Sequence, residues 1–368
     1  MRERVSRVKT KMGVKKIVLI IIAGVVVAAG LVFVGLMLYG QHQMSKIPAM
    51  TFEECLQYTT AGNDNAVITV GVIKDGKADW TVYGKDGAEL PKTLHTYEIG
   101  SLTKTVTASM VMKLVDEGKM SLDAPISDYL ELPARAHYPT IRELLTHTSG
   151  YSSYYFEGAM IGNFFGGKNS FYGIGDSAIL NTLKNTEIAD KQHKFDYSNF
   201  GYAALGLILE KVTGTEFTRL CEDYLHDELG LANSRISDGS GDLGKLWDWQ
   251  PGDTYMAAGA VLSDIEDMLD YAQLQLDGFS ENHESFAVID TVNENHRKMG
   301  INMDEIGAAW LIDRENGFVW HNGGTGNYNS YLGFCEKTKT AVVVLSNLAP
   351  RYKIPATVLG LKKLQSLQ

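Results

Sequence analysis

Strand-like patterns occur at two places far apart in this sequence, and this separation constrains the fold more than any other feature. Residues 66–74 (AVITVGVIK) and 78–84 (ADWTVYG) flank an Asp-Gly pair, which is typical of a β-hairpin. Three or four further strands are expected near the C-terminus, from residues 308–313, 318–322, 329–335 and 340–347. We expect the two strand-rich segments to join in one antiparallel sheet.

Between these segments the apolar residues follow a helical period. Leu102, Val106 and Met110 recur at intervals of four, as do Leu205 and Leu209. The predicted fold class is therefore α/β (α+β), an antiparallel sheet flanked by helices with an inserted all-helical subdomain. The domain would cover residues 52–368, with an α/β part at 52–118 and 300–368 and a mainly helical part at 119–299.

Residues 151–175 combine glycine with eight aromatic residues and show little periodicity, which predicts a long loop. Long loops are often lids. The aromatic side chains could wall a substrate cleft or pin the loop onto the helical part, and the sequence favours neither. They are Tyr151, Tyr154, Tyr155, Phe156, Phe164, Phe165, Phe171 and Tyr172.

Residues 17–39 form a run of 23 residues without a charge. As a helix this run would be about 34 Å long, enough to cross a hydrocarbon core of about 30 Å. A cleaved signal peptide is the alternative, but its apolar region is usually shorter. We expect a membrane anchor, preceded by a basic cytoplasmic tail (1–16) and followed by a short stalk (40–51). The domain would then lie outside the cell membrane, on the extracytoplasmic side.

The net charge of −10 excludes one class of partner. Residues 1–16 carry a net charge of +6, which leaves −16 on the remainder. Nucleic acid is not expected as a partner, because its binding depends on neutralisation of phosphates by basic residues. Cys55, Cys221 and Cys335 are too few for a disulfide framework, and we expect them to act as small apolar residues. No metal-binding or cofactor motif is present, so neither is expected.

Ser101 and Lys104 stand at the start of one of the predicted helices. Residues three apart share a helix face, so Lys104 can place its amine beside the Ser101 hydroxyl. A lysine with a lowered pKa can take the serine proton and make the oxygen a nucleophile. Ser6 and Lys9 have the same spacing in the basic tail, and a serine at a helix start is also an ordinary cap, so the spacing alone leaves both interpretations open.

Two other short motifs carry polar groups suited to catalysis. Tyr197-Ser198-Asn199 precedes a predicted helix, and a tyrosine held near a lysine ammonium loses its proton more easily and could act as base or relay. The run from His321 to Gly324 ends a predicted strand, and its glycines would let the backbone approach a ligand. A helix-entry tyrosine and a plain hairpin turn are the structural alternatives.

Together the motifs S-x-x-K, Y-x-N and H-x-G resemble the serine β-lactamase and penicillin-binding protein superfamily. The chain is most similar to its class C β-lactamase-like branch, which includes D-alanyl-D-alanine carboxypeptidases and esterases. The resemblance extends from about residue 52 to 350. It is carried in family order by residues 97–130, 140–151, 195–214, 256–269 and 321–334.

The resemblance implies a role for each matching residue. Ser101 would be the nucleophile, Lys104 its proton partner and Tyr197 a general base or proton relay. The Asn199 side chain would hold the acyl side chain of the substrate. The remaining implied roles are an oxyanion hole from the backbone N–H groups of Ser101 and Gly324, and a substrate-binding strand formed by His321, Asn322 and Gly323.

The strand motif departs from the family pattern. His321 and Asn322 stand where β-lactamases usually carry Lys-Thr, and a histidine is mostly neutral near pH 7. We therefore expect poor β-lactam hydrolysis by an otherwise intact acyl-transfer site. The expected function is a serine hydrolase resembling D-alanyl-D-alanine carboxypeptidases and acting on a small-molecule or peptide substrate. An esterase, a weak β-lactamase and a non-catalytic peptidoglycan sensor are the alternatives. His147 in LLTHTSG is expected to have a structural role.

Overall fold

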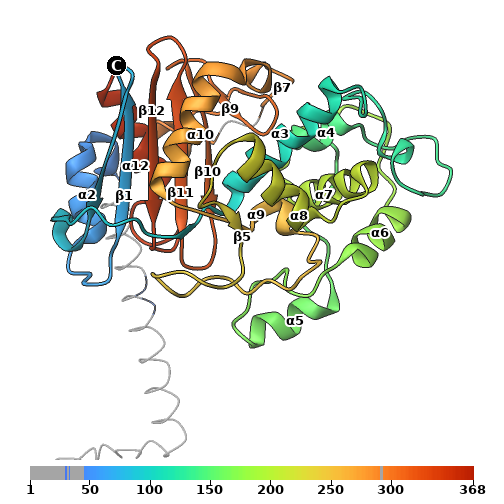
Figure 1. The fold of residues 1–368 in the computed structure, drawn as a ribbon, viewed down its shortest axis with the longest axis horizontal. Helices are drawn as coiled ribbons and strands as arrows, with labels where there is room; N and C mark the ends of the chain where they lie inside the picture. Colours follow the sequence, from blue (N-terminus) through green and yellow to red (C-terminus); the bar gives the residue numbers. More distant parts are fainter. Residues whose placement is uncertain (1–29, 31–32, 34–44, 291–292) are drawn as a thin grey trace, which may run out of the picture. The chain divides into compact units, whose positions relative to one another are not determined.

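The computed structural model of this chain describes residues 30, 33, 45–290 and 293–368 (Figure 1). The chain divides into two units, residues 1–50 and 51–368. The described residues of the first unit include one short turn, η1 (Ile47–Ala49). Except for Gly30 and Phe33, the predicted tail and anchor lie outside the described residues, as do residues 40–44 of the stalk. Within the part of the chain that is described, no helix is long and apolar enough to cross a membrane.

The second unit contains a nine-stranded antiparallel sheet in which strands from both ends of the sequence lie side by side. The strand order is β3-β2-β1-β12-β11-β10-β9-β8-β7. The strands are β1 (Ile68–Lys74), β2 (Lys77–Tyr83), β3 (Glu89–Leu90), β7 (Ala287–Val288), β8 (Glu305–Ile306), β9 (Leu311–Asp313), β10 (Phe318–Gly324), β11 (Asn329–Cys335) and β12 (Thr340–Ser346).

The pairing of β1 with β12 closes the sheet between its N-terminal and C-terminal parts. Val70 lies opposite Val344 in this antiparallel pair, which confirms the predicted joining of the two strand-rich segments. The hairpin between β1 and β2 is also confirmed. Asp75 and Gly76 at its tip have φ angles of 53° and 68°. Two successive positive φ angles suit the right-handed twist of a hairpin, and this is why the Asp-Gly pair is a strong hairpin signal.

Helices cover both faces of the central strands. Helix α10 (Ile265–Gly278) packs on β1, β11 and β12 and crosses the front of the sheet in Figure 1. Helix α12 (Ala356–Ser366) packs on β11 and β12 and also contacts α2 (Phe52–Thr60). All seven residues of β12 are buried, as expected for a strand covered on both faces.

The remaining helices form a second layer beside the sheet, shown on the right of Figure 1. They are α3 (Thr103–Asp116), α4 (Ile141–Leu145), α5 (Gly158–Phe165), α6 (Asp176–Asn185), α7 (Asn199–Thr213), α8 (Phe217–Asp223) and α9 (Met256–Gly259), and a further short helix, α11 (Glu294–Lys298), precedes β8. The predicted antiparallel sheet with flanking helices is confirmed.

The inserted part is not all helical, and the prediction was wrong in this respect. Strands β5 (Arg235–Ile236) and β6 (Val261–Ser263) form a small sheet with β4 (Tyr97–Glu98). Strand β7 extends the main sheet from within the range predicted to be helical. Strands of two or three residues are too short to show an alternating pattern, so only tertiary pairing reveals them.

The predicted loop at residues 151–175 contains a helix, α5. Met160, Ile161, Phe164 and Phe165 recur at a helical spacing, but Gly158 and Gly162 lower the intrinsic helix propensity of the segment. The aromatic residues of this segment differ in burial. Tyr151 is buried, whereas Phe164 is exposed.

Candidate active site

The Ser101 hydroxyl and the Lys104 amine meet at the start of α3. Ser101 lies in a single 3-10 turn, η3 (Gly100–Leu102), which runs directly into α3. Lys104 Nζ lies 3.2 Å from Ser101 Oγ. It also donates to Asn199 Oδ1 at 2.8 Å and to the Ala258 carbonyl oxygen at 2.7 Å. The amine is therefore held where α3, α7 and α9 meet.

Burial controls the charge of Lys104. Its side chain is 0% exposed, and none of its three hydrogen-bond partners is a carboxylate. Burial therefore holds the pKa of the Lys104 amine well below its ordinary value of 10.5. A neutral amine donates two hydrogen bonds and keeps one lone pair. Because Asn199 Oδ1 and the Ala258 oxygen can only accept, the lone pair is left to face Ser101.

Tyr197 contacts both Ser101 and Lys104. It ends the loop before α7, where the Ser198 side chain caps the helix by accepting from the Gly201 N–H at 2.9 Å. The Tyr197 phenol hydrogen bonds with Ser101, and its ring centroid lies 4.9 Å from Lys104 Nζ. Burial raises the pKa of Tyr197, and the hydrogen bond with Ser101 only partly offsets this. The phenol is therefore neutral, contrary to the expectation that a lysine ammonium would promote its ionisation.

The His147 ring packs against the Tyr197 ring. The two ring centroids are 4.4 Å apart, and His147 Nδ1 accepts a hydrogen bond from the Ser198 N–H at 3.0 Å. Burial, reinforced by the nearby Lys104, lowers the pKa of His147 well below 6.5, so the ring is neutral. Its proton then resides on Nε2. His147 therefore lies directly beside the candidate site. Its sequence context suggested a structural role but did not reveal this location.

Strand β10 lies against the turn that carries Ser101, and only glycines permit this approach. A Cβ atom on Gly323 would lie 1.8 Å from the Ile99 carbonyl oxygen, and one on Gly100 would lie 2.6 Å from Gly324 N. Gly100 also has a φ angle of 53°. The backbone of β10 at Gly324 therefore faces the backbone of the Ser101 turn.

His321 is buried within β10 and carries no charge. Its Nδ1 donates to the Asn322 carbonyl oxygen at 2.7 Å. Burial, assisted by the nearby Lys104, lowers the pKa of His321 to about 3. Asn322, the next residue along the strand, is partly exposed. The expectation of a neutral histidine at this position agrees with this pKa direction.

Asn199 uses both ends of its amide within the protein. Its Oδ1 accepts from Lys104, and its Nδ2 donates to Ser153 Oγ at 3.4 Å. The resemblance assigned this side chain to the acyl group of a substrate. In this structure it also orients the Lys104 amine, which spacing along the sequence could not indicate.

Glu98 is a buried carboxylate that the sequence analysis missed. It accepts hydrogen bonds from the Trp247 N–H at 2.6 Å and from the Thr325 hydroxyl. Burial raises the pKa of Glu98, although these hydrogen bonds oppose the shift. Glu98 thus links Thr325, the residue after Gly324, to the loop that carries Trp247. No motif marks it, because its partners lie more than 140 positions away in the sequence.

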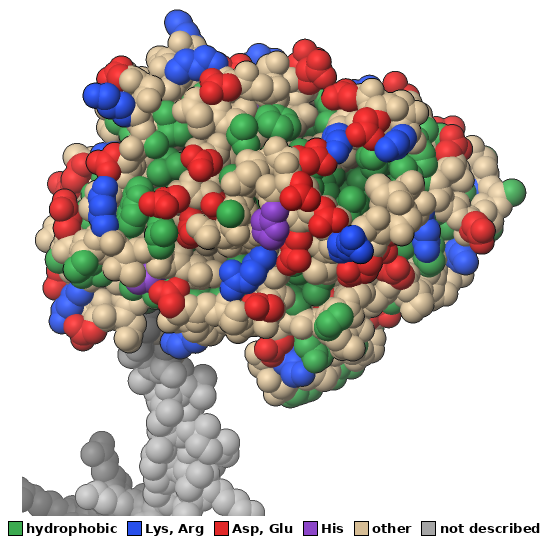
Figure 2. All heavy atoms as spheres, viewed as in Figure 1, with side chains coloured by type: hydrophobic (Ala, Val, Ile, Leu, Met, Phe, Trp, Pro, Cys, Tyr) green, Lys and Arg blue, Asp and Glu red, His purple; other side chains and the backbone are tan. Residues whose placement is uncertain are grey.

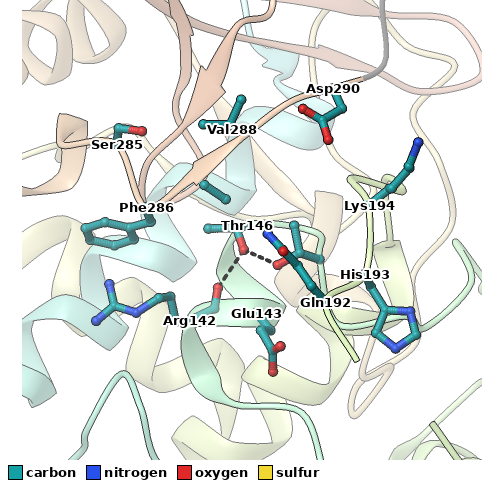
Figure 3. Close-up of a pocket in the computed structure, with 12 residues that line it drawn as sticks. Arg142, Glu143, Thr146, Gln192, His193, Lys194, Ser285, Phe286, Val288 and Asp290 are labelled. Atoms are coloured by element: carbon teal, nitrogen blue, oxygen red, sulfur yellow. Dashed lines mark hydrogen bonds between the residues drawn. The ribbon is translucent and has the colours of Figure 1, made fainter. Parts of the chain in front are cut away.

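A separate cavity of about 610 Å³ lies near the C-terminal end of α4 (Figure 3). Arg142, Lys194 and Phe286 are among the residues that line it, and none of the predicted site residues does. Across the residues that the structure describes, no group of three or more His, Cys, Asp or Glu side chains is arranged to hold a metal ion.

We predict that Gly323→Ala will destabilise the fold, because the added Cβ would collide with backbone rather than with a movable side chain. The expected loss in the free energy of unfolding is about 3 kcal/mol, at the upper end for overpacked sites. Urea titration of the two proteins measures it. Gly278→Ala is the matched control, since no atom lies within 4 Å of its Cβ position, and it should leave stability nearly unchanged. Equal midpoints for wild type and Gly323→Ala would contradict the described contact between β10 and η3.

The chain was compared with known protein families and with known proteins. The β-lactamase family profile matches residues 52–363. Protein flp of Staphylococcus aureus (strain MW2) is 24% identical over 286 residues, which cover 70% of this chain and 53% of that protein. The chain therefore spans about half the length of this curated relative.

Solved structures share the fold. The octameric penicillin-binding protein homologue from Pyrococcus abyssi superposes with a TM-score of 0.66 at 24% identity, covering 82% of this chain and 73% of that one. The β-lactamase/D-alanine carboxypeptidase from Yersinia pestis superposes with a TM-score of 0.64 at 18% identity, covering 88% and 98%. With the family profile spanning residues 52–363, these findings confirm the resemblance seen in the sequence: the chain belongs to the β-lactamase family.

Proposed function

We propose that this protein is a serine hydrolase that acts through an acyl-enzyme on Ser101. One observation carries the proposal: the Ser101 hydroxyl contacts both the buried Lys104 amine, whose pKa is lowered by burial, and the neutral Tyr197 phenol. A serine hydroxyl is a weak nucleophile until a neighbouring base takes its proton. A desolvated lysine amine is such a base.

The proposed reaction begins with attack on a carbonyl carbon. A bond forms between Ser101 Oγ and that carbon while the serine proton passes to Lys104 Nζ. The backbone N–H groups of Ser101 and Gly324 would then stabilise the oxyanion. As the intermediate collapses, the bond to the leaving group breaks. The leaving atom takes a proton from Tyr197, which regains one from the Lys104 ammonium.

Hydrolysis of the acyl-enzyme completes the cycle. A water molecule attacks the acyl carbon and gives its proton to the Lys104 amine, and Ser101 leaves with that proton. The pKa shifts of Lys104 and Tyr197 agree with their proposed roles as base and proton donor. A lowered lysine pKa suits a base near neutral pH, and a raised tyrosine pKa suits a proton donor.

A fluorophosphonate should label the wild-type protein covalently, and Ser101→Ala should abolish this labelling. We expect Lys104→Met and Tyr197→Phe each to slow ester hydrolysis by about 10²–10⁴, the usual loss when acid-base assistance is removed. Intact mass and p-nitrophenyl acetate turnover are the measurements. Stoichiometric labelling of Ser101→Ala would refute the assignment of the nucleophile. A stable adduct on Ser101 without any turnover would favour the non-catalytic sensor.

Because His321 on β10 is neutral, we expect the site to prefer substrates without a carboxylate. A cation facing a substrate carboxylate contributes a hydrogen bond of about 1.5–3 kcal/mol, and neutral His321 cannot supply it. We therefore place uncharged esters first among the substrate classes and expect weak β-lactam hydrolysis. This moves the emphasis from the carboxypeptidase favoured by the sequence analysis toward the esterase alternative.

A second candidate, D-alanyl-D-alanine carboxypeptidase action, is favoured by Arg351. This residue is exposed and follows Pro350, whose ring would lie 2.5 Å from a Cβ on Gly324. Its guanidinium therefore belongs to a segment that touches the proposed oxyanion strand. An arginine here could bind the C-terminal carboxylate of a peptide in place of the lysine that His321 replaces.

Peptides ending in D-alanyl-D-alanine, with a free carboxylate or as the C-terminal amide, separate the two candidates. If Arg351 binds the carboxylate, kcat/KM should favour the free acid by about tenfold or more, and Arg351→Gln should remove that preference. Arg219→Gln is the control, because Arg219 is exposed on α8. Equal rates for acid and amide in the wild type, with faster ester turnover, would leave the esterase as the function.

We also propose that residues 17–39 anchor the protein in the cell membrane with the hydrolase domain outside. The support is the uncharged run and the basic residues before it. Full-length protein should stay with membranes after carbonate washing, and a chain that begins at residue 41 should be released. A soluble mature form that begins near residue 31 would instead identify a cleaved signal peptide.

A further inference from the structure

An apolar pocket of about 450 Å³ is formed by α5 and the loop that carries Trp247. The lobe bearing α5 lies at the bottom of Figure 1, and hydrophobic side chains appear on its surface in Figure 2. Phe156, Phe164 and Phe165 in its lining are 69%, 76% and 82% exposed. Such values are unusual for phenylalanine in a folded domain. The complete lining is Tyr154, Phe156, Met160, Ile161, Phe164, Phe165, Ser170, Phe171 and Trp247.

Buried polar contacts join the segments that line the pocket. The Asn163 amide on α5 is buried and donates to the carbonyl oxygens of Ser170 and Tyr172, at 3.2 and 2.8 Å. Asn169 Nδ2 donates to the Asp248 carbonyl oxygen at 3.4 Å, which joins this segment to the Trp247 loop. These contacts fix α5, residues 169–172 and the Trp247 loop relative to one another.

One wall of the pocket adjoins the Lys104 side of the candidate site. Tyr154 follows Ser153, whose hydroxyl accepts from Asn199. Asn199 in turn accepts from Lys104. The centroid of the Phe171 ring lies 4.2 Å from that of the Tyr255 ring, and the two rings are stacked. Tyr255 immediately precedes α9, the helix that supplies the Ala258 carbonyl to Lys104.

Trp247, another residue of the lining, lies near the end of strand β10. The Trp247 indole nitrogen would lie 2.6 Å from a Cβ on Gly326, two residues beyond Gly324. The backbone N–H of Trp247 is held by Glu98, which also binds Thr325. Tyr154 and Trp247 therefore connect the pocket lining to the two segments, at Asn199 and at Gly324, that lie near Ser101.

The side chains that line the pocket indicate which kind of ligand it binds. No charged side chain lines the pocket, and Ser170 is the single aliphatic hydroxyl in it. From these contacts we infer that the pocket binds a hydrocarbon group of the substrate, so that the preferred substrates are esters with a medium-length alkyl or aryl chain. This inference rests on the proposed ester hydrolysis at Ser101. The hydrocarbon can belong to the acyl part or to the alcohol part of the ester, and the two are separable by experiment.

The test compares p-nitrophenyl octanoate with p-nitrophenyl acetate, both below the concentration at which the longer ester aggregates. Each buried methylene raises the rate constant kcat/KM by up to about fourfold, so we expect octanoate to be favoured at least tenfold. Phe156→Ser with Phe164→Ser should bring the ratio close to one. Both side chains are largely exposed, so the fold should tolerate the changes. Val288→Ser, at an exposed apolar residue of the other cavity, should leave the ratio unchanged.

Octyl acetate compared with ethyl acetate tests the alcohol side in the same way. A chain-length preference in one series that the Phe156 and Phe164 changes remove supports the subsite and identifies the part it binds. Ser101-dependent hydrolysis of acetates with no chain-length preference in either series would overturn the inference while the proposed function stands. A preference that survives both phenylalanine changes would overturn it as well.

Binding to Ser101→Ala makes the subsite testable without turnover. Calorimetric titration should show p-nitrophenyl octanoate binding at least tenfold more tightly than the acetate, and the added Phe156→Ser and Phe164→Ser changes should abolish the difference. Equal affinities of Ser101→Ala for the two esters would refute the subsite. Loss of fluorophosphonate labelling in the wild type would instead refute the proposed function, whatever the affinities are.

Discussion

A lysine side chain buried without a carboxylate partner is the constraint on which the candidate site depends. Lys104 is fully enclosed, and its amine contacts a hydroxyl, a side-chain amide and a backbone carbonyl. Burying an unpaired ammonium is very unfavourable, so the group shifts its pKa and becomes neutral instead. The helices α3, α7 and α9 must all be in place for this burial to exist. The reactivity proposed for Ser101 is therefore a property of the packed domain.

The same burial removes charge from the surroundings of the serine. His147 and His321 are both buried, and burial is the main cause that lowers the pKa of each. Tyr197 remains a neutral phenol. A site composed of neutral donors and acceptors can move a proton at little cost, but it has no fixed cation for an anionic substrate. A substrate carboxylate would have to be bound by a residue outside the site, such as Arg351. An uncharged ester would need no such residue.

Close backbone packing gives the site its shape. Gly100 and Gly323 bring the Ser101 turn and strand β10 together without intervening side chains. Beyond that strand, Glu98 ties the Trp247 loop to Thr325. The position of the aromatic pocket follows from these contacts, since its Trp247 wall is fixed to the same strand that faces Ser101. The proposed recognition of hydrocarbon and the proposed activation of Ser101 would thus depend on the same strand.

The sequence by itself determined the longer strands, the Asp-Gly hairpin and the possibility that Lys104 faces Ser101, because each depends on spacing within a few residues. The residues also marked Tyr197 and the β10 motif as candidates, but only the resemblance assigned them to the same site as Ser101, because their separation in sequence hides their proximity. Only the tertiary structure decided the short strands β5 to β7, the helix within residues 151–175 and the roles of Glu98 and His147. It also decided the charge states, since the pKa of Lys104 depends on burial by segments about 95 and 154 residues away. Local periodicity carries no information about such long-range desolvation, which arises only when distant segments exclude water together.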